Sequence, residues 1–216
     1  MDVLNSPFIK QGGYSMLVIG LTGGLGTGKS EVLKILGNLG AYTVDTDEIA
    51  HQLYEPYSSV WETIVSQFGK GILCADGKID RFTLGKLIFS DTTSREMLNR
   101  IMHPQIYKAC KREICQSKKR GIEVIVLEVP LLVEVGWVDI VDEIWLANSS
   151  YKQVMFRLQT HRKLSKEDIH GRINSQISFE DRRKYANVVI NNSGTLEQLH
   201  DVVGDLWKTR VKGLTS

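Results

Sequence analysis

The residues best suited to chemistry form a glycine-rich run that ends in a lysine and a serine. The segment 23–30 reads Gly-Gly-Leu-Gly-Thr-Gly-Lys-Ser, which fits the pattern G-x-x-x-x-G-K-[ST]. Glycines let consecutive backbone N–H groups turn toward phosphate oxygens, because no Cβ stands in the way. The spacing therefore predicts a phosphate-binding loop in which Lys29 reaches the β- and γ-phosphates of a nucleotide and Ser30 offers its hydroxyl to Mg²⁺.

Carboxylates follow two of the predicted strands. Asp45 and Asp47 come after the apolar run 41–44, and Glu128 follows the run 124–127. Ligands of open α/β sheets bind outside the carboxyl ends of the strands. We therefore predict that Asp47 orients an acceptor hydroxyl and takes its proton, and that Asp45 and Glu128 belong to the metal shell. The alternatives are a helix N-cap for either aspartate and an ordinary strand-end carboxylate for Glu128.

A basic segment from about Tyr151 to Lys184 is predicted as a helical hairpin. Such a hairpin can close arginines over the phosphates, stabilise transition-state charge and exclude water. The alternative is a solvated basic face, and the lone histidine is the weakest candidate catalyst. The basic residues in question are Arg157, His161, Arg162, Arg172, Arg182 and Arg183.

Strand and helix patterns alternate around these residues and predict an α/β fold. A buried strand at 17–21 leads into the loop, a helix runs over 30–39, and a second strand covers 41–44. Strand, helix and strand in this order form a βαβ unit with parallel strands. The stretch 49–117 is mostly helical and too long for a crossover, so we expect an inserted subdomain. Its turns are predicted at 55–56, 75–77 and 103–104, and later elements are strands 124–127, 143–146 and 188–190 and a helix over 196–207.

Composition narrows the class of protein further. The 216 residues suit one substantial α/β domain, and a net charge of +2 favours neither nucleic acid nor membrane as the main partner. Three cysteines without a Cys-x-x-Cys pair are typical of reduced thiols, which predicts a cytoplasmic location. Residues 1–15 carry no continuous hydrophobic stretch and are expected to form a loose extension. No sequence feature indicates an obligate protein partner.

The order of several motifs resembles the dephospho-coenzyme A kinase family, and the match runs over almost the whole chain from Val18. A phosphate loop alone is shared by many enzymes. The Thr-Gly-Gly opening at 22–24, Asp-Thr-Asp-Glu-Ile-Ala at 45–50 and Val-Pro-Leu-Leu at 129–132 are far more specific in this order. Shorter matches lie at 68–69, 76–81, 88–89, 103–104, 134, 153, 157, 172, 176 and 189–192.

The resemblance implies a kinase that transfers the γ-phosphate of ATP to the 3′-hydroxyl of dephospho-CoA, the last step of coenzyme A biosynthesis. It implies a three-layer core with a five-stranded parallel sheet, a CoA-side domain at about 49–117 and a lid at about 151–184. Asp47, Lys29 and Arg157 are then catalytic. The implied acceptor contacts are Asp47, Arg81, His103, Pro130 and Leu131, and the implied ATP contacts are Gly24, Gly26, Thr27, Gly28, Lys29, Ser30, Glu31, Arg157 and Asn192.

Three positions depart from the family pattern. Glu31 follows Ser30 where a small hydroxyl residue is usual, which adds a negative charge near the phosphates. His161 and Arg162 stand where a second lid arginine and its neighbour are expected, so either residue is a candidate for that role. Asn187 replaces a usual aspartate, and we expect a structural role there.

Other functional classes fit the sequence less well. A GTP-dependent switch would favour an Asn-Lys-x-Asp segment, which is missing. An RNA-binding or partner-binding protein would need an aromatic stacking platform or a stronger basic charge. A kinase for nucleosides or nucleotides is the nearest alternative, and only substrate tests separate it.

Overall fold

The computed structural model describes residues 16–211, so the predicted extension 1–15 lies outside the described residues. The strands are β1 (Leu17–Gly23), β2 (Tyr42–Asp45), β3 (Val124–Glu128), β4 (Glu143–Asn148) and β5 (Val188–Asn191). The α-helices are α1 (Lys29–Asn38), α2 (Thr46–Leu53), α3 (Ser59–Phe68), α4 (Arg81–Ser90), α5 (Thr92–Lys119), α6 (Tyr151–Arg162), α7 (Lys166–Asn174), α8 (Phe179–Arg183) and α9 (Leu196–Leu206). Short helical turns cover Lys70–Ile72, Trp137–Ile140 and Trp207–Val211.

The five strands form one parallel sheet in the order β2-β3-β1-β4-β5, which confirms the predicted sheet. Every residue of β1 and β3 is buried, as expected for strands covered on both faces. All strands run the same way, so their carboxyl ends meet at one edge. That edge collects Gly23, Asp45, Glu128, Asn148 and Asn191.

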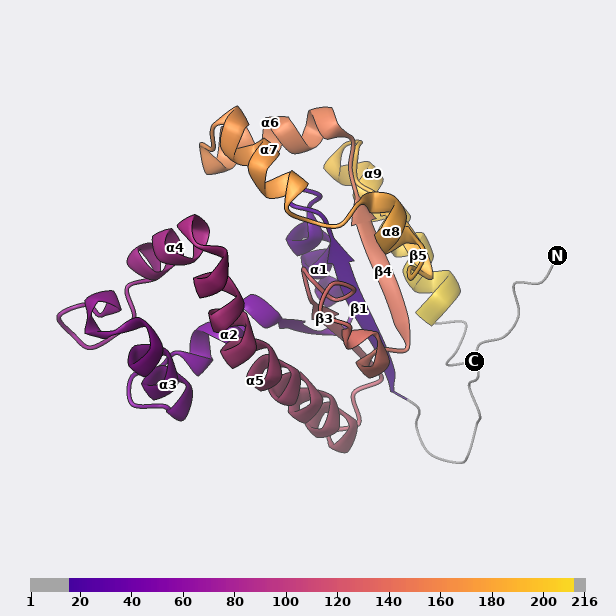
Figure 1. The fold of residues 1–216 in the computed structure, drawn as a ribbon. Coiled ribbons are helices and arrows are strands. Elements are labelled where there is room, and N and C mark those ends of the chain that lie inside the picture. The colour runs from indigo at the N-terminus through magenta and orange to yellow at the C-terminus, as the bar shows by residue number, and fades with distance from the viewer. Residues whose placement is uncertain (1–15, 212–216) are drawn as a thin grey trace.

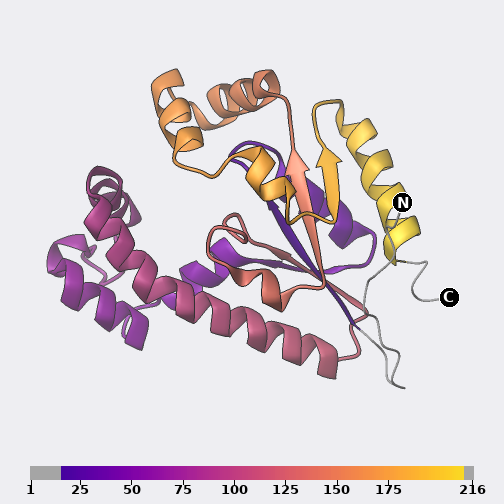
Figure 2. The same cartoon turned by 45° about the vertical axis from the view of Figure 1, so that its right-hand side comes forward.

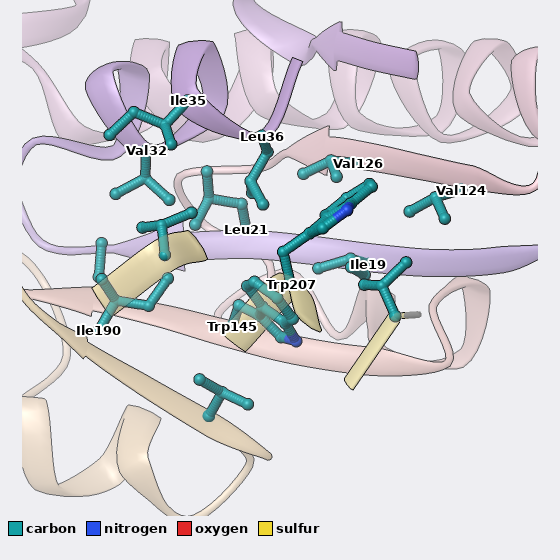
Figure 3. Packing of buried hydrophobic residues seen from close by; sticks show 14 of the residues in the cluster. Ile19, Leu21, Val32, Ile35, Leu36, Val124, Val126, Trp145, Ile190 and Trp207 are labelled. Atoms are coloured by element: carbon teal, nitrogen blue, oxygen red, sulfur yellow. The ribbon is translucent and has the colours of Figure 1, made fainter. Parts of the chain in front are cut away.

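Helices cover both faces of the sheet and make three layers. On one face α1, α9 and the turn after α9 pack against alternate strand residues, with Trp145 and Trp207 at the centre (Figure 3). On the other face α5 and the turn at Trp137 cover Val18, Ile125 and Ile144. Asn187, expected to be structural, ties β5 to β4: its Oδ1 accepts a hydrogen bond of 2.8 Å from Ile144 N.

Helices α2 to α5 fill the stretch between β2 and β3 and extend to one side of the sheet (Figure 2). They have a core of their own, which includes Ile64, Leu84 and Met102. The turns at 55–56 and 75–77 are present, but the turn predicted at His103–Pro104 is wrong, because α5 continues through Pro104. Proline removes one helical hydrogen bond, and packing on both sides of it holds the helix together: Met102 lies in this core and Cys110 in the sheet core.

The segment predicted as a hairpin contains three helices. Helices α6 and α7 pack on each other through Val154, Leu158 and Ile169, above the carboxyl ends of β4 and β5 (Figure 2). Helix α8 contacts β4 instead of extending the pair. Within residues 16–211, no helix has the length and apolar character needed to cross a bilayer.

Candidate active site

The glycine-rich loop lies between β1 and α1, and its backbone is shaped for a ligand rather than for a side chain. Gly26 and Gly28 have φ values of 73° and 88°, which favour glycine. Gly28 caps α1 without any side-chain hydrogen bond, so the first amides of that helix remain available to an anion. A Cβ on Gly28 would lie 2.1 Å from Asn192 Nδ2, so no other residue fits there.

Lys29 folds back onto the loop. Its Nζ donates hydrogen bonds to the carbonyl oxygens of Gly23 (3.0 Å) and Gly24 (3.2 Å). Burial lowers the pKa of Lys29, and the nearby Glu128 carboxylate opposes that shift. A phosphate at the loop would give this ammonium a stronger partner than two neutral carbonyls, because charged hydrogen bonds are stronger.

Oxygen ligands converge beside the start of α1. Ser30 Oγ donates to Glu128 Oε1 over 3.3 Å, and Glu128 Oε2 is buried with no partner. Burial raises the pKa of Glu128, while Lys29 opposes the rise. An orphaned carboxylate oxygen next to a hydroxyl fits a hard cation such as Mg²⁺. Among the described residues, no three His, Cys, Asp or Glu side chains come close enough to hold a metal on their own, so a ligand's phosphates would have to complete the shell.

Asp45 and Asp47 differ in their surroundings. β2 ends at Asp45, whose Oδ1 accepts a 2.8 Å hydrogen bond from Asp47 N and caps α2. This is the N-cap alternative considered for the pair, and it leaves Asp45 beside Glu128 in the strand register. The Asp47 side chain stays exposed at the cavity surface. Desolvation by the cavity wall raises the pKa of Asp47, and the negative charge of Asp45 adds to the rise.

Arg157 reaches the loop from α6. Its Nη2 donates to the backbone oxygen (2.8 Å) and to Oδ1 (3.1 Å) of Asn192, and its Nη1 donates to Ser149 Oγ over 3.3 Å. Asn192 Nδ2 in turn donates to Thr27 O over 2.9 Å. Arg157 is thus held beside the phosphate loop through Asn192. Ser149 was absent from the sequence prediction, and no motif there pointed to it.

A cavity of about 680 Å³ unites most of the predicted residues. Both His161 and Arg162 lie on its wall, and the Arg162 charge acts on Asp47 and Lys29. Glu31, which departs from the family pattern, is also on the wall. The lining residues are Leu25, Gly26, Gly28, Lys29, Ser30, Glu31, Asp45, Asp47, Glu128, Pro130, Arg157, Leu158, His161, Arg162, Gln176, Asn192, Gly194, Leu196 and Leu199.

Several predicted residues lie away from this cavity. Gly24 and Thr27 line a second cavity, and Thr27 Oγ1 donates to Gly24 O over 2.8 Å. Arg81 is exposed at the start of α4, near enough to Tyr54 for its charge to act on that phenol. His103 packs against the Trp137 ring, with centroids 6.0 Å apart, and Leu131 is 37 % exposed. Of the predicted acceptor residues other than Asp47, only Pro130 lines the main cavity.

Comparison with known proteins identifies the family of this chain. Residues 17–198 match the family model described as dephospho-CoA kinase. The chain is 37 % identical to the dephospho-CoA kinase of Geobacter sulfurreducens, over 90 % of this chain and 99 % of the relative. It is 40 % identical to that of Corynebacterium diphtheriae, over 89 % and 96 %.

Solved structures show the same fold. Dephospho-CoA kinase from Campylobacter jejuni superposes with a TM-score of 0.69 at 26 % identity, over 91 % of this chain and 98 % of that one. Shikimate kinase from Acinetobacter baumannii has a TM-score of 0.56 at 12 % identity, over 93 % and 96 %, a likeness of fold alone. The phosphate loop and the carboxylates Asp45, Asp47 and Glu128 agree with the match along residues 17–198. The chain therefore belongs to the dephospho-CoA kinase family.

Proposed function

We propose that the protein transfers the γ-phosphate of ATP to the 3′-hydroxyl of dephospho-CoA and so forms coenzyme A. The observation that carries the proposal is the single cavity in which the phosphate loop, Asp47 and Arg157 meet. A donor phosphate and an acceptor hydroxyl can be held in line there without water between them.

Asp47 is the proposed general base. Its raised pKa makes it a stronger base than an ordinary aspartate, and its side chain is open to the cavity. Lys29 releases the two loop carbonyls to contact the β- and γ-phosphates. Arg157 and Arg162 stabilise the negative charge that spreads over the transferred group. We assign the second arginine role to Arg162 rather than His161, because the Arg162 charge acts on both Asp47 and Lys29.

Mg²⁺ is proposed to be held by Ser30, Glu128 and Asp45 together with the ATP phosphates. When bound, it neutralises charge on the β- and γ-phosphate oxygens. The ATP contacts are proposed at Gly24, residues 26–31, Arg157 and Asn192. The acceptor contacts are proposed at Arg81, His103, Pro130 and Leu131, with helices α2 to α5 as the CoA-side domain and α6 to α8 as the lid.

We further propose that the protein acts in the cytoplasm, that neither nucleic acid nor membrane is its partner, and that it needs no obligate protein partner. The cysteines Cys74, Cys110 and Cys115 are all free, which is consistent with a reducing compartment.

The direct test is a coupled ADP-release assay with Mg²⁺ and ATP, with and without dephospho-CoA, in which the product is identified by mass. We expect ADP release that depends on dephospho-CoA and yields coenzyme A. Asp47→Asn should lower kcat by about a thousandfold and leave ATP binding intact, since it removes only the proton acceptor. Glu48→Gln, the exposed neighbour on α2, is the matched control. Coenzyme A formation at the wild-type rate by Asp47→Asn would remove the base assignment.

A further inference from the structure

Arg182 is a buried cation in a segment that otherwise faces solvent. It is 4 % exposed, whereas Asp181, Arg183 and Lys184 on either side of it are exposed. The sequence placed it among the candidate lid arginines of one basic segment, with a solvated basic face as the alternative. Burying one guanidinium from a helix as short as α8 needs a specific partner, because an unpaired buried charge is very costly.

The partner is Glu134, and the pair is incompletely hydrogen-bonded. Arg182 Nη2 donates to Glu134 Oε1, but Arg182 Nε and Glu134 Oε2 are both buried with no partner. A buried ion pair with unmet hydrogen bonds contributes little to stability, since desolvation offsets the attraction. A contribution to fold stability therefore does not explain the pair, and its contacts indicate another role.

The location of the pair suggests that role. Arg182 Nη1 lies 3.6 Å from the position that a Cβ on Gly24 would take, so the guanidinium packs against the first turn of the phosphate loop. Gln176 Oε1, on the segment before α8, accepts a 3.1 Å hydrogen bond from Leu25 N. These two contacts support the loop from the side of the second cavity, which measures about 590 Å³ and is also lined by Gly24, Leu25 and Thr27.

Glu134 connects this support to the proposed acceptor side. It belongs to a run of tight turns over 129–136, in which Val135 N donates to Leu131 O over 2.9 Å. Pro130, in the same run, lines the main cavity and accepts a 3.2 Å hydrogen bond from Thr22 Oγ1. A shift of this run on acceptor binding would reach the phosphate loop through Glu134 and Arg182.

Charge adds a second link between Arg182 and the loop. Burial lowers the pKa of Lys29, and the positive charges of Arg182 and Arg162 lower it further against the pull of Glu128 and Asp47. Arg182 and Lys29 therefore repel each other in the ligand-free protein. Phosphate oxygens near both cations would relieve that repulsion.

We infer that Arg182, oriented by Glu134, is a positioning residue that fixes the first turn of the phosphate loop relative to the acceptor-side run 129–136. This inference rests on the proposed function. Arg182 acts through the loop residues Gly24, Leu25 and Lys29 and does not need to touch the substrate itself.

The experiment compares Arg182→Met, Arg182→Lys and Glu134→Gln with Arg183→Met. Arg183 is the matched control: although the sequence made it a candidate lid arginine, it is exposed on the same helix, lines neither cavity, and its Nη1 donates to Ala186 O. For each variant we would measure kcat, the KM of each substrate, the Kd of Mg-ATP by calorimetry and the Tm. We expect Arg182→Met to lower kcat about a hundredfold and to weaken Mg-ATP binding about tenfold, since small displacements of reacting groups have large effects. Arg182→Lys should recover part of kcat and part of the Mg-ATP affinity. Glu134→Gln should give values between those of Arg182→Met and the wild type, and Arg183→Met should match the wild type.

A purely structural pair gives a different result. Suppose that Arg182→Met lowers the Tm but, at assay temperatures well below that Tm, keeps kcat and Mg-ATP affinity within about twofold of the wild type. That result would overturn the inference. If Arg182→Met does not fold, Glu134→Gln becomes the deciding variant, and a wild-type kcat in Glu134→Gln would overturn the inference. If the wild type transfers nothing to dephospho-CoA, the proposed function fails separately. The calorimetric Kd then decides the inference, because it needs no acceptor.

Discussion

The proposed donor and acceptor sides of the site are built in different ways. On the donor side, the phosphate loop, Arg157 and Asn192 are joined by hydrogen bonds between segments more than a hundred residues apart in the chain. On the acceptor side, Arg81 is exposed and His103 packs against Trp137, away from the cavity. The proposed donor residues are therefore joined around one cavity, whereas of the proposed acceptor residues other than Asp47 only Pro130 lines it.

The difference follows from what each side has to recognise. Phosphates are bound by backbone N–H groups and a helix N-terminus, which the strand–loop–helix unit provides as soon as it folds. The proposed acceptor contacts are side chains on separate elements, α4 and α5 among them, and these helices have a core of their own. Donor-side substitutions should thus act on ATP and on chemistry, and acceptor-side substitutions on the acceptor alone.

The largest effect is expected from Lys29→Met. This change removes the ammonium that the proposal directs to the β- and γ-phosphates, and kcat should fall about a thousandfold. Steady-state assays and Mg-ATP calorimetry would measure it. Lys34→Met, on the exposed face of the same helix, should leave both quantities unchanged. Equal losses in the two variants would mean that α1 itself is damaged and would remove the donor-side assignment.

A smaller donor-side effect is expected from Asn192→Ala. The change removes the side-chain hydrogen bonds to Thr27 O and from Arg157, which weakens the support that the loop and the arginine share, while the bond from Arg157 Nη2 to the backbone oxygen of residue 192 remains. The KM for ATP should rise about tenfold while the KM for dephospho-CoA stays nearly constant. Asn191→Ala is the control, because that exposed side chain accepts a hydrogen bond from Ser193 N in its own turn and lines neither cavity. An equal rise in both KM values would contradict the division into two sides.

The acceptor side is tested by Arg81→Met. Its removal should raise the KM for dephospho-CoA several-fold, by about 1 kcal/mol of binding, and leave the KM for ATP unchanged. His103→Ala should act in the same direction and more weakly, since His103 faces Trp137. Arg95→Met, an exposed arginine on α5, is the control. An unchanged KM for dephospho-CoA in Arg81→Met would take Arg81 out of the acceptor site.

The sequence predicted the strand, loop and helix around residues 23–30 well, because the signals for them are local. The glycine spacing of 23–30 and the apolar run before it are enough to specify a strand, a loop and a helix. The strand-end position of Glu128 also followed from its neighbours, and the structure adds its hydrogen bond with Ser30.

Sequence reasoning failed where distant contacts decide the outcome. Pro104 was assigned to a turn because proline usually ends helices, yet packing on both sides carries α5 through it. The burial of Arg182 against Glu134 gave no signal in a run of charged residues. Asp45 illustrates the middle case: its place at the strand end was predictable, but the hydrogen bond by which it caps α2 needed the backbone geometry, and its metal role stays a proposal.

The smallest expected effect is a pH-dependent change in Tm that reports the charge of Asp47. The pKa of Asp47 is raised above the ordinary 3.8 in the folded protein, so folding favours its protonated form. Stability from this source is present below pH 3.8 and is lost as pH rises through the higher folded pKa. Asp47→Asn should therefore have a slightly higher Tm than wild type at pH 7, and the difference should vanish near pH 3.8. Calorimetric scans across this range measure it, with Glu48→Gln as the control. The same raised pKa places the acid limb of kcat/KM above pH 3.8. A Tm difference that persists unchanged at low pH would show that the carboxylate charge is not its cause.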